Sequence, residues 1–150
     1  MTALHYVQTQ ITYAIRNDAG LIVLFNSGVP QISMNLNPNN QQFPFIVYRL
    51  RLQTAYTDSD MRNGTLYFSV YDFNRDVTRA EAIADRISKI FNKTDFQDLS
   101  GVCAAIRTFQ CSGYDFMPTD NVDIQRVDVG IPIRFLDVAA QLEKIAKNGG

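Results

Sequence analysis

The sequence has few of the residues on which most catalytic and metal-binding signatures depend. Its 150 residues include one histidine, two cysteines and no tryptophan. This shortage excludes a zinc site of cysteine and histidine ligands, because the cysteines are not spaced as C-x-x-C and His5 supplies the only imidazole. His5 stands alone on an expected helix, so we interpret it as a surface or packing residue rather than a general base.

Clusters of glycine are also missing. The glycines between residues 20 and 130 are isolated, so neither a dinucleotide-binding G-x-G-x-x-G motif nor a phosphate-binding loop can be drawn, and no G-x-S-x-G elbow exists. Asp72, Asn74 and Asp76 begin like a calcium loop. That loop needs glycine at its sixth position and glutamate at its twelfth, where this chain has Val77 and Ile83. We therefore expect no catalytic residue, no cofactor and no metal ion.

The chain lacks an excess of charge of either sign and any long hydrophobic run. A net charge of −1 with no basic stripe offers no long-range attraction for nucleic acid. The longest apolar run, LIVLF at 21–25, is far below the roughly 20 residues that cross a bilayer, and the first residues do not resemble a signal peptide. Cys103 and Cys111 fall on one side of an expected strand, roughly 26 Å apart, so we expect reduced thiols in a cytosolic protein.

What the sequence does contain is a clear pattern of helices. Residues 5–18 carry an apolar stripe at helical spacing, with Gly20 at the expected stop. Residues 78–91 carry a stronger stripe, and Thr78 with Glu81 forms the T-x-x-E pattern of a capping box. Both segments predict helices that bury one face.

Alternation of apolar and polar residues predicts strands. It runs through FPFIVYRLRLQTAY (43–56) and TLYFSVYDF (65–73), and Asn63-Gly64 between them predicts a hairpin turn. Further strands are expected at 102–111 and 122–135, and LIVLF is a candidate buried strand. Pro132 has no amide hydrogen, which predicts an edge strand or a bulge near Gly130.

These elements predict one α+β domain over residues 1–150, with a mainly antiparallel, mixed sheet of about four to five strands and helices packed on one face. Residues 26–43, with five asparagines, predict a long loop or arm. Residues 137–150 are expected to form either a short helix capped by Asp137 or a flexible tail.

Two groups of residues are candidate interaction sites. Arg49 and Arg51 face Tyr67 and Tyr71 across the hairpin, which indicates either cross-strand pairs on a solvated face or a subunit interface. Tyr114, Phe116 and Met117 lie in an expected loop at 112–123, where bulky apolar groups favour contact with another molecule.

The order of these segments resembles the tail terminator, or tail-completion, proteins of long-tailed bacteriophages. The resemblance is carried by Phe43-Pro44-Phe45-Ile46-Val47-Tyr48, by the strand from Leu66 to Phe73 that ends in Tyr-Asp-Phe, and by the helix from Ala80 to Phe91. It covers about two-thirds of the chain, from Phe43 to Phe135 together with the first helix. The asparagine-rich arm has no counterpart that can be aligned.

The resemblance implies a structural virion protein, not an enzyme, assembled in the host cytoplasm as a ring, usually a hexamer. The ring closes the head-proximal end of the tail tube, stops tube polymerisation and contacts the head connector, and genome DNA passes through it without sequence-specific binding. No catalytic residues are implied. We expect Arg49 and Arg51 to serve contacts between subunits rather than the lumen. The alternatives are another neck or head-completion protein, or a small α+β enzyme or ligand-binding domain with an internal polar pocket.

Overall fold

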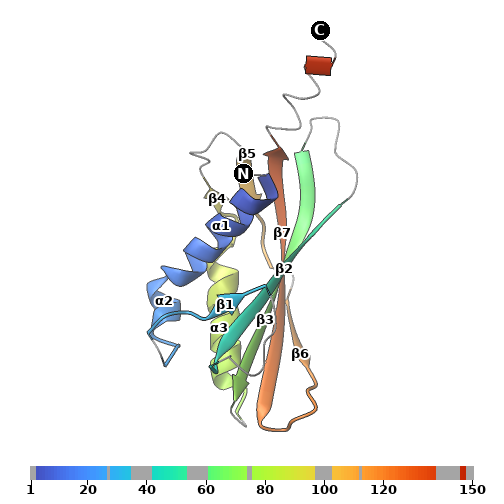
Figure 1. Ribbon diagram of the computed structural model, residues 1–150. Coiled ribbons are helices and arrows are strands. Elements are labelled where there is room, and N and C mark those ends of the chain that lie inside the picture. The colour runs from blue at the N-terminus through green and yellow to red at the C-terminus, as the bar shows by residue number, and fades with distance from the viewer. Residues whose placement is uncertain are drawn as a thin grey trace.

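The computed structural model describes residues 3–26, 28–34, 42–53, 61–73, 76–96, 103–111, 113–137 and 146–147. Three helices lie on one face of a mixed sheet (Figure 1). The helices are α1 (Ala3–Arg16), α2 (Ala19–Ile22) and α3 (Thr78–Ile90). The strands are β1 (Ile32–Ser33), β2 (Phe45–Leu52), β3 (Met61–Phe73), β4 (Asp95–Phe96), β5 (Cys103–Thr108), β6 (Tyr114–Met117) and β7 (Ile124–Asp137). The predicted α+β class, mixed sheet and one-sided helices are confirmed.

The sheet is larger than expected. Its described strands number seven, and six of them follow the order β1-β2-β3-β7-β5-β4. The seventh, β6, pairs with the same edge of β7 as β5 does, but nearer the beginning of β7. β1 is parallel to β2, and every other described pair is antiparallel. The additional strands are β1 and β4, of two residues each, and β6, which lies in the segment predicted as a loop.

β7 occupies the centre of the sheet, so the prediction that Pro132 marks an edge strand is wrong. β7 pairs with β3 along its length and, on its other side, with β6 up to Val129 and β5 from Ile133. Pro132 lies between these two partners, where its missing amide hydrogen leaves no ladder bond unmade. Its carbonyl accepts from the amide of Phe109 at 2.9 Å. The bulge is in β5, where the register shifts between Ala104 and Arg107.

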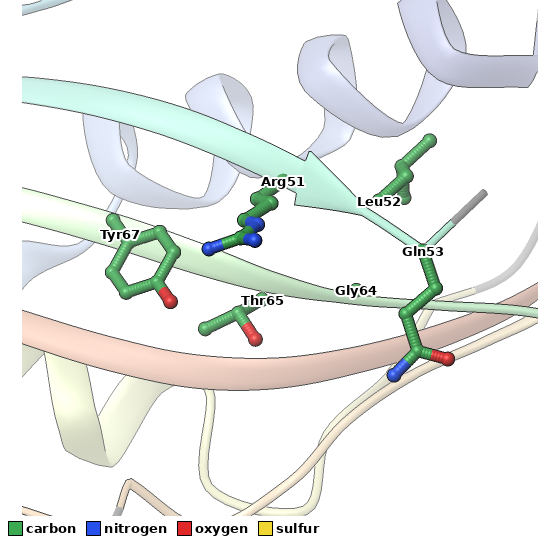
Figure 2. Close-up of a pocket in the computed structure, with 6 residues that line it drawn as sticks. All are labelled: Arg51, Leu52, Gln53, Gly64, Thr65 and Tyr67. Atoms are coloured by element: carbon green, nitrogen blue, oxygen red, sulfur yellow. The ribbon is translucent and has the colours of Figure 1, made fainter.

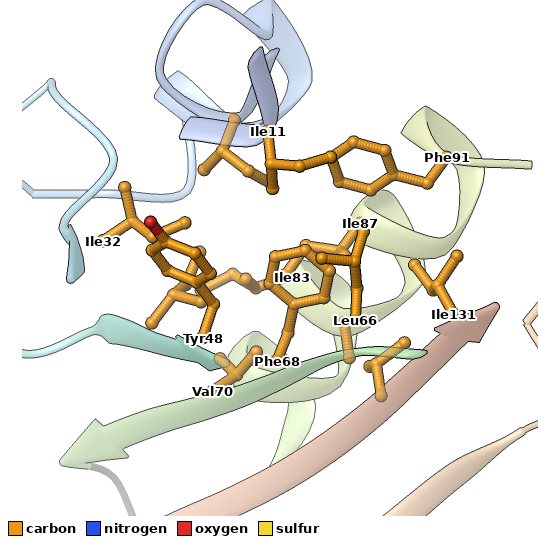
Figure 3. Packing of buried hydrophobic residues seen from close by; sticks show 14 of the residues in the cluster. Ile11, Ile32, Tyr48, Leu66, Phe68, Val70, Ile83, Ile87, Phe91 and Ile131 are labelled. Atoms are coloured by element: carbon orange, nitrogen blue, oxygen red, sulfur yellow. The ribbon is translucent and has the colours of Figure 1, made fainter. Parts of the chain in front are cut away.

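The core lies between the helices and the inner face of β2, β3 and β7. Alternate residues of each strand point inward, and α1 and α3 each contribute a stripe at helical spacing. Phe68 and Phe91 stack at its centre with ring centroids 5.5 Å apart (Figure 3). The fully buried members of the core are Val7, Ile11, Ile15, Leu21, Ile46, Phe68, Val70, Ala80, Ile83, Ala84, Ile87, Phe91, Val127, Ile131 and Phe135. Each large side chain stabilises the fold by about 1.5–3 kcal/mol.

The prediction of a strand at LIVLF is wrong, because the segment continues the helical layer. The Asp18 carboxylate accepts from the amide of Leu21 at 2.9 Å and so caps α2. Leu21 and Phe25 are buried at a spacing of four, whereas Val23 between them is 80% exposed. Gly20 therefore lies within a helical turn rather than at a helix stop.

The predicted hairpin turn and the predicted helix cap are also wrong. Asn63-Gly64 lies inside β3, where Gly64 pairs with Leu52 of β2, so the hairpin connection falls in 54–60, outside the described residues. The helix at α3 is capped at Val77 rather than by a capping box. The Asp76 carboxylate instead accepts from both the amide and the hydroxyl of Thr78.

The remaining expectations concern the arm, the tail and the thiols. β1 lies within 26–43, and residues 35–41 of the expected arm lie outside the described residues. Asp137 is the last residue of β7, so it caps no helix, and of residues 138–150 only 146–147 are described. β5 ends at Thr108, so Cys103 and Cys111 do not share a strand, and Cys111 is a free thiol. None of the helices in the described ranges is long and apolar enough to cross a membrane.

Candidate functional site

The face of the sheet opposite the helices is the candidate site. We call it the open face, because no described helix packs against it (Figure 1). Side chains alternate between the two faces along each strand. The residues of β2 in phase with Arg49, and their register partners on β3 and β7, therefore point away from the helices. They are Val47, Arg49 and Arg51 from β2, Thr65, Tyr67, Ser69 and Tyr71 from β3, and Arg126, Asp128, Gly130, Pro132 and Arg134 from β7.

Aromatic rings and guanidinium groups stack on one another across this face. Arg49 and Tyr67 are register partners, and the Arg49 guanidinium lies 4.7 Å from the ring centroid. The Tyr71 ring has Phe45 stacked on it at 4.9 Å and the Arg126 guanidinium 5.5 Å from its centroid. Each cation–π contact of this kind contributes about 0.5–1 kcal/mol at an exposed site. The structure thus brings the predicted Arg49, Tyr67 and Tyr71 together.

The charge of the middle of the open face is neutralised internally. Arg126 donates two hydrogen bonds of 2.9 Å to the two carboxylate oxygens of Asp128. These bonds raise the pKa of Arg126, and burial of the guanidinium opposes them. On the same strand, Arg134 donates to the side-chain oxygen of Asn63 at 2.8 Å. Fixed pairs of this type orient the side chains that surround them.

Arg51, like Arg49, is exposed and forms no ion pair within the described ranges. It lines a hollow of about 510 Å³ together with Leu52, Gln53, Gly64, Thr65 and Tyr67. Figure 2 shows the side chains of Arg51, Thr65 and Tyr67 gathered beside one another over β3. A second hollow of about 270 Å³ follows the sheet from Arg49 towards Arg126. Both hollows open on the same face.

The second group of predicted residues forms a strand rather than a loop tip. Tyr114, Phe116 and Met117 belong to β6, which pairs with the beginning of β7. A four-residue strand with three exposed positions has too weak an alternation signal for the sequence to predict a strand there.

The three residues of β6 are not equivalent. Tyr114 is half-buried, and its hydroxyl donates to Asp85 and contacts Ser88 of α3, each at 3.0 Å. Burial raises the pKa of Tyr114, and the bond to Asp85 acts in the same direction. Tyr114 therefore anchors β6 to α3. Phe116 and Met117 remain 56% and 39% exposed and are available to another molecule.

An acidic segment follows these exposed side chains. From Gly113 to Gln125 the chain carries Asp115, Asp120 and Asp123 and no lysine or arginine. Asp115 and Asp120 are exposed, and Val122 beside them is 80% exposed.

Sequence reasoning also missed two ion pairs of α3. Arg79 donates two hydrogen bonds to Asp72, whose side chain is fully buried. Arg86 donates two of 2.8 Å to Asp18, which joins α3 to the start of α2. Asp72 lies in phase with the inward-facing Phe68 and Val70, and that phase was the available signal. Among the described residues, no group of three or more histidine, cysteine or acidic side chains gathers as a metal site would require.

Comparison with solved structures finds the same fold in a chain from the virion of a native gene transfer agent particle. The two chains superpose with a TM-score of 0.68 and 16% sequence identity, over 90% of this chain and 98% of the other. At this identity the likeness establishes the fold. No family model and no curated protein sequence matches the chain.

Proposed function

We propose that this protein is a structural subunit of a phage-type virion, and that copies of it form a closed ring at the head-proximal end of a tail tube. The ring ends polymerisation of the tube protein and presents a surface to the head connector. Arg49, Arg51, Tyr67, Tyr71, Phe116 and Met117 lie at contacts between subunits or with the tube, and Tyr114 holds β6 in position for them.

The observation that carries the proposal is the fold likeness to a virion chain over nearly the full length of both proteins. It agrees with the resemblance of segments 43–48, 66–73 and 80–91 to tail terminator proteins. The open face adds an independent argument. A sheet face with aromatic and arginine side chains has the composition of a protein–protein interface, where tyrosine, phenylalanine, methionine and arginine are enriched.

The direct test is a capping assay. Tail tube protein from the same particle is polymerised with increasing amounts of this protein, and tube length is measured by negative-stain electron microscopy. We expect tubes to shorten and to carry a ring at one end only. Tubes of unchanged length with bare ends would contradict the proposal, and binding to the head connector alone would favour a different neck component.

A further inference from the structure

We infer that copies of this chain join side by side through opposite charges, with the acidic β6 side of one copy seated on the basic β2 side of the next. This inference rests on the proposed ring and names its contact surfaces. The basic side is the strand segment 42–53 with Arg49 and Arg51. The acidic side is the segment 113–125 with Asp115 and Asp120.

Each of the two segments contains charged residues of one sign only. Segment 42–53 contains two arginines and no acidic residue, and segment 113–125 contains three aspartates and no basic residue. Arg49, Arg51, Asp115 and Asp120 are all exposed. The chain is almost neutral as a whole, with a net charge of −1, so this separation is a property of the fold rather than of the composition.

The sheet places these segments on opposite sides of the molecule. Where β6 pairs with β7, the order of strands is β1, β2, β3, β7 and β6. β1 pairs with β2 only at Ile46 and Val47, so Arg49 and Arg51 lie beyond the paired residues of β1. Three strand spacings, about 14 Å in total, separate β2 from β6. Through the register, Asp115 stands opposite Asp128, Ser69 and Val47 in turn, two residues along β2 from Arg49. The charged rows therefore lie at nearly the same height on the two flanks.

This placement favours a head-to-tail contact over a face-to-face one. Two copies that met through their basic sides would bring Arg49 and Arg51 of each copy together, and like charges at an interface oppose association. A contact between different sides of identical copies is heterologous, and it generates a ring when the rotation per copy closes the circle. Opposite flanks of one sheet are suited to such a rotation.

The apolar groups on the two sides are also complementary. Phe116, Met117 and Val122 project from the acidic side, where each is between 39% and 80% exposed. The basic side offers the 510 Å³ hollow beside Arg51, bordered by the ring of Tyr67 (Figure 2). The apolar side chains of one copy would enter the hollow of the next copy, which has an arginine and a tyrosine at its rim. This arrangement matches an interface with an apolar core and a charged border.

Paired charge reversals test the inference. The basic-side variant is Arg49→Glu with Arg51→Glu, and the acidic-side variant is Asp115→Lys with Asp120→Lys. Each is compared with the wild type by light scattering coupled to size exclusion, at low and high salt. We expect each variant to associate roughly 100-fold more weakly, because like charges then meet at every contact. High salt weakens wild-type association, because it screens exposed charges.

The decisive measurement is the mixture. The basic-side variant has two acidic sides and the acidic-side variant has two basic sides, so an equimolar mixture is expected to assemble with the two alternating. A chain that carries all four substitutions is expected to assemble by itself. Helix-side reversals Arg16→Glu and Glu81→Lys are the matched controls and should leave association unchanged, with circular dichroism confirming that every variant is folded.

Several results would overturn the inference. They are full association of the acidic-side variant, a mixture in which both variants stay monomeric, and a quadruple variant that does not assemble. The proposed function is judged separately by the capping assay. Rings that form through these sides but do not cap tubes would contradict the function alone, and capping by the acidic-side variant would contradict the inference alone.

Discussion

A single side chain of α3 connects that helix to α2. Arg86 and Asp18 form a bidentate pair in which Asp18 also caps α2 through the amide of Leu21. Hydrogen bonds from Arg86, more than any other cause, lower the pKa of Asp18 below its usual value near 4. The folded state therefore holds Asp18 ionised at a pH where the unfolded chain already binds a proton, so this pair stabilises the protein at neutral pH and is lost in acid.

The substitution Asp18→Asn isolates this charge, because asparagine also accepts from a helix amide. At pH 7 we expect the free energy of unfolding to fall by about 0.5–1 kcal/mol, the range for a part-exposed pair. The difference from the wild type should shrink as the pH falls below about 4, because Asp18 then gains a proton first in the unfolded chain and, at lower pH, in the folded chain. Urea unfolding at pH 7 and pH 3 measures both quantities. Glu81→Gln, at an exposed carboxylate on the helical side, is the control.

At Gly64 the strands β2 and β3 approach too closely for a side chain. A Cβ atom there would lie 2.6 Å from the carbonyl oxygen of Arg51 and 2.8 Å from Leu52. We expect Gly64→Ala to lower the free energy of unfolding by about 1–3 kcal/mol, as overpacking does. At Gly130 a Cβ atom would meet nothing nearer than Tyr67 at 3.6 Å, so Gly130→Ala serves as the matched control. Equal stability of the two variants in thermal unfolding would contradict this account.

At the scale of elements, long periodic segments were predictable and short ones were not. The apolar stripe of α3 and the alternation of β2 and β3 each repeat over several turns or residue pairs. The sequence alone therefore predicts which face of each element is buried. β1, β4 and β6 have two to four residues, too few to show a period. Their positions depend on partners distant in the sequence, as when β6 pairs with β7.

Local turn chemistry was overridden at specific residues. Asn63-Gly64 is a strong hairpin signal, yet Asn63 bonds to Arg134 of β7 and Gly64 admits the Arg51 carbonyl, so both are used inside the sheet. Of the candidate site, alternation alone predicted that Arg49 and Tyr67 share one face of the sheet, whereas their direct pairing depends on a register that the sequence did not predict. The position of the acidic side across the sheet from β2 was not predictable, because it depends on the order of the strands.

One phenolic hydroxyl links β6 to the helical layer. Tyr114→Phe removes its bonds to Asp85 and Ser88 while keeping the ring, so we expect a loss of about 1 kcal/mol in the free energy of unfolding. The larger effect is local, with faster hydrogen exchange at the amides of β6 and unchanged exchange at β2. Tyr13→Phe, at an exposed position of α1, is the control. Unchanged protection of β6 in Tyr114→Phe would show that the bonds to α3 do not hold the strand.

At the scale of the whole molecule, assembly and stability are coupled. Association that favours the folded state raises the unfolding midpoint with protein concentration. We therefore expect the Tm of the wild type to rise over a 100-fold increase in concentration, by roughly a few degrees. The Tm of the Arg49→Glu, Arg51→Glu variant should stay constant, because its folded monomer is intact but does not associate. Scanning calorimetry at two concentrations makes the comparison, and a concentration dependence shared by both proteins would contradict it.

The central position of β7 has a consequence for how the chain is made. β7 follows every other described strand in the sequence, yet β3, β5 and β6 all hydrogen-bond to it. During translation, therefore, the strands that precede it emerge from the ribosome without their shared neighbour, and the apolar inner face of β3 lacks Val127, Ile131 and Phe135 until late in synthesis. The nascent chain therefore has an incomplete sheet edge and an exposed apolar face for most of its elongation, which are the features that make a partly folded chain prone to aggregation.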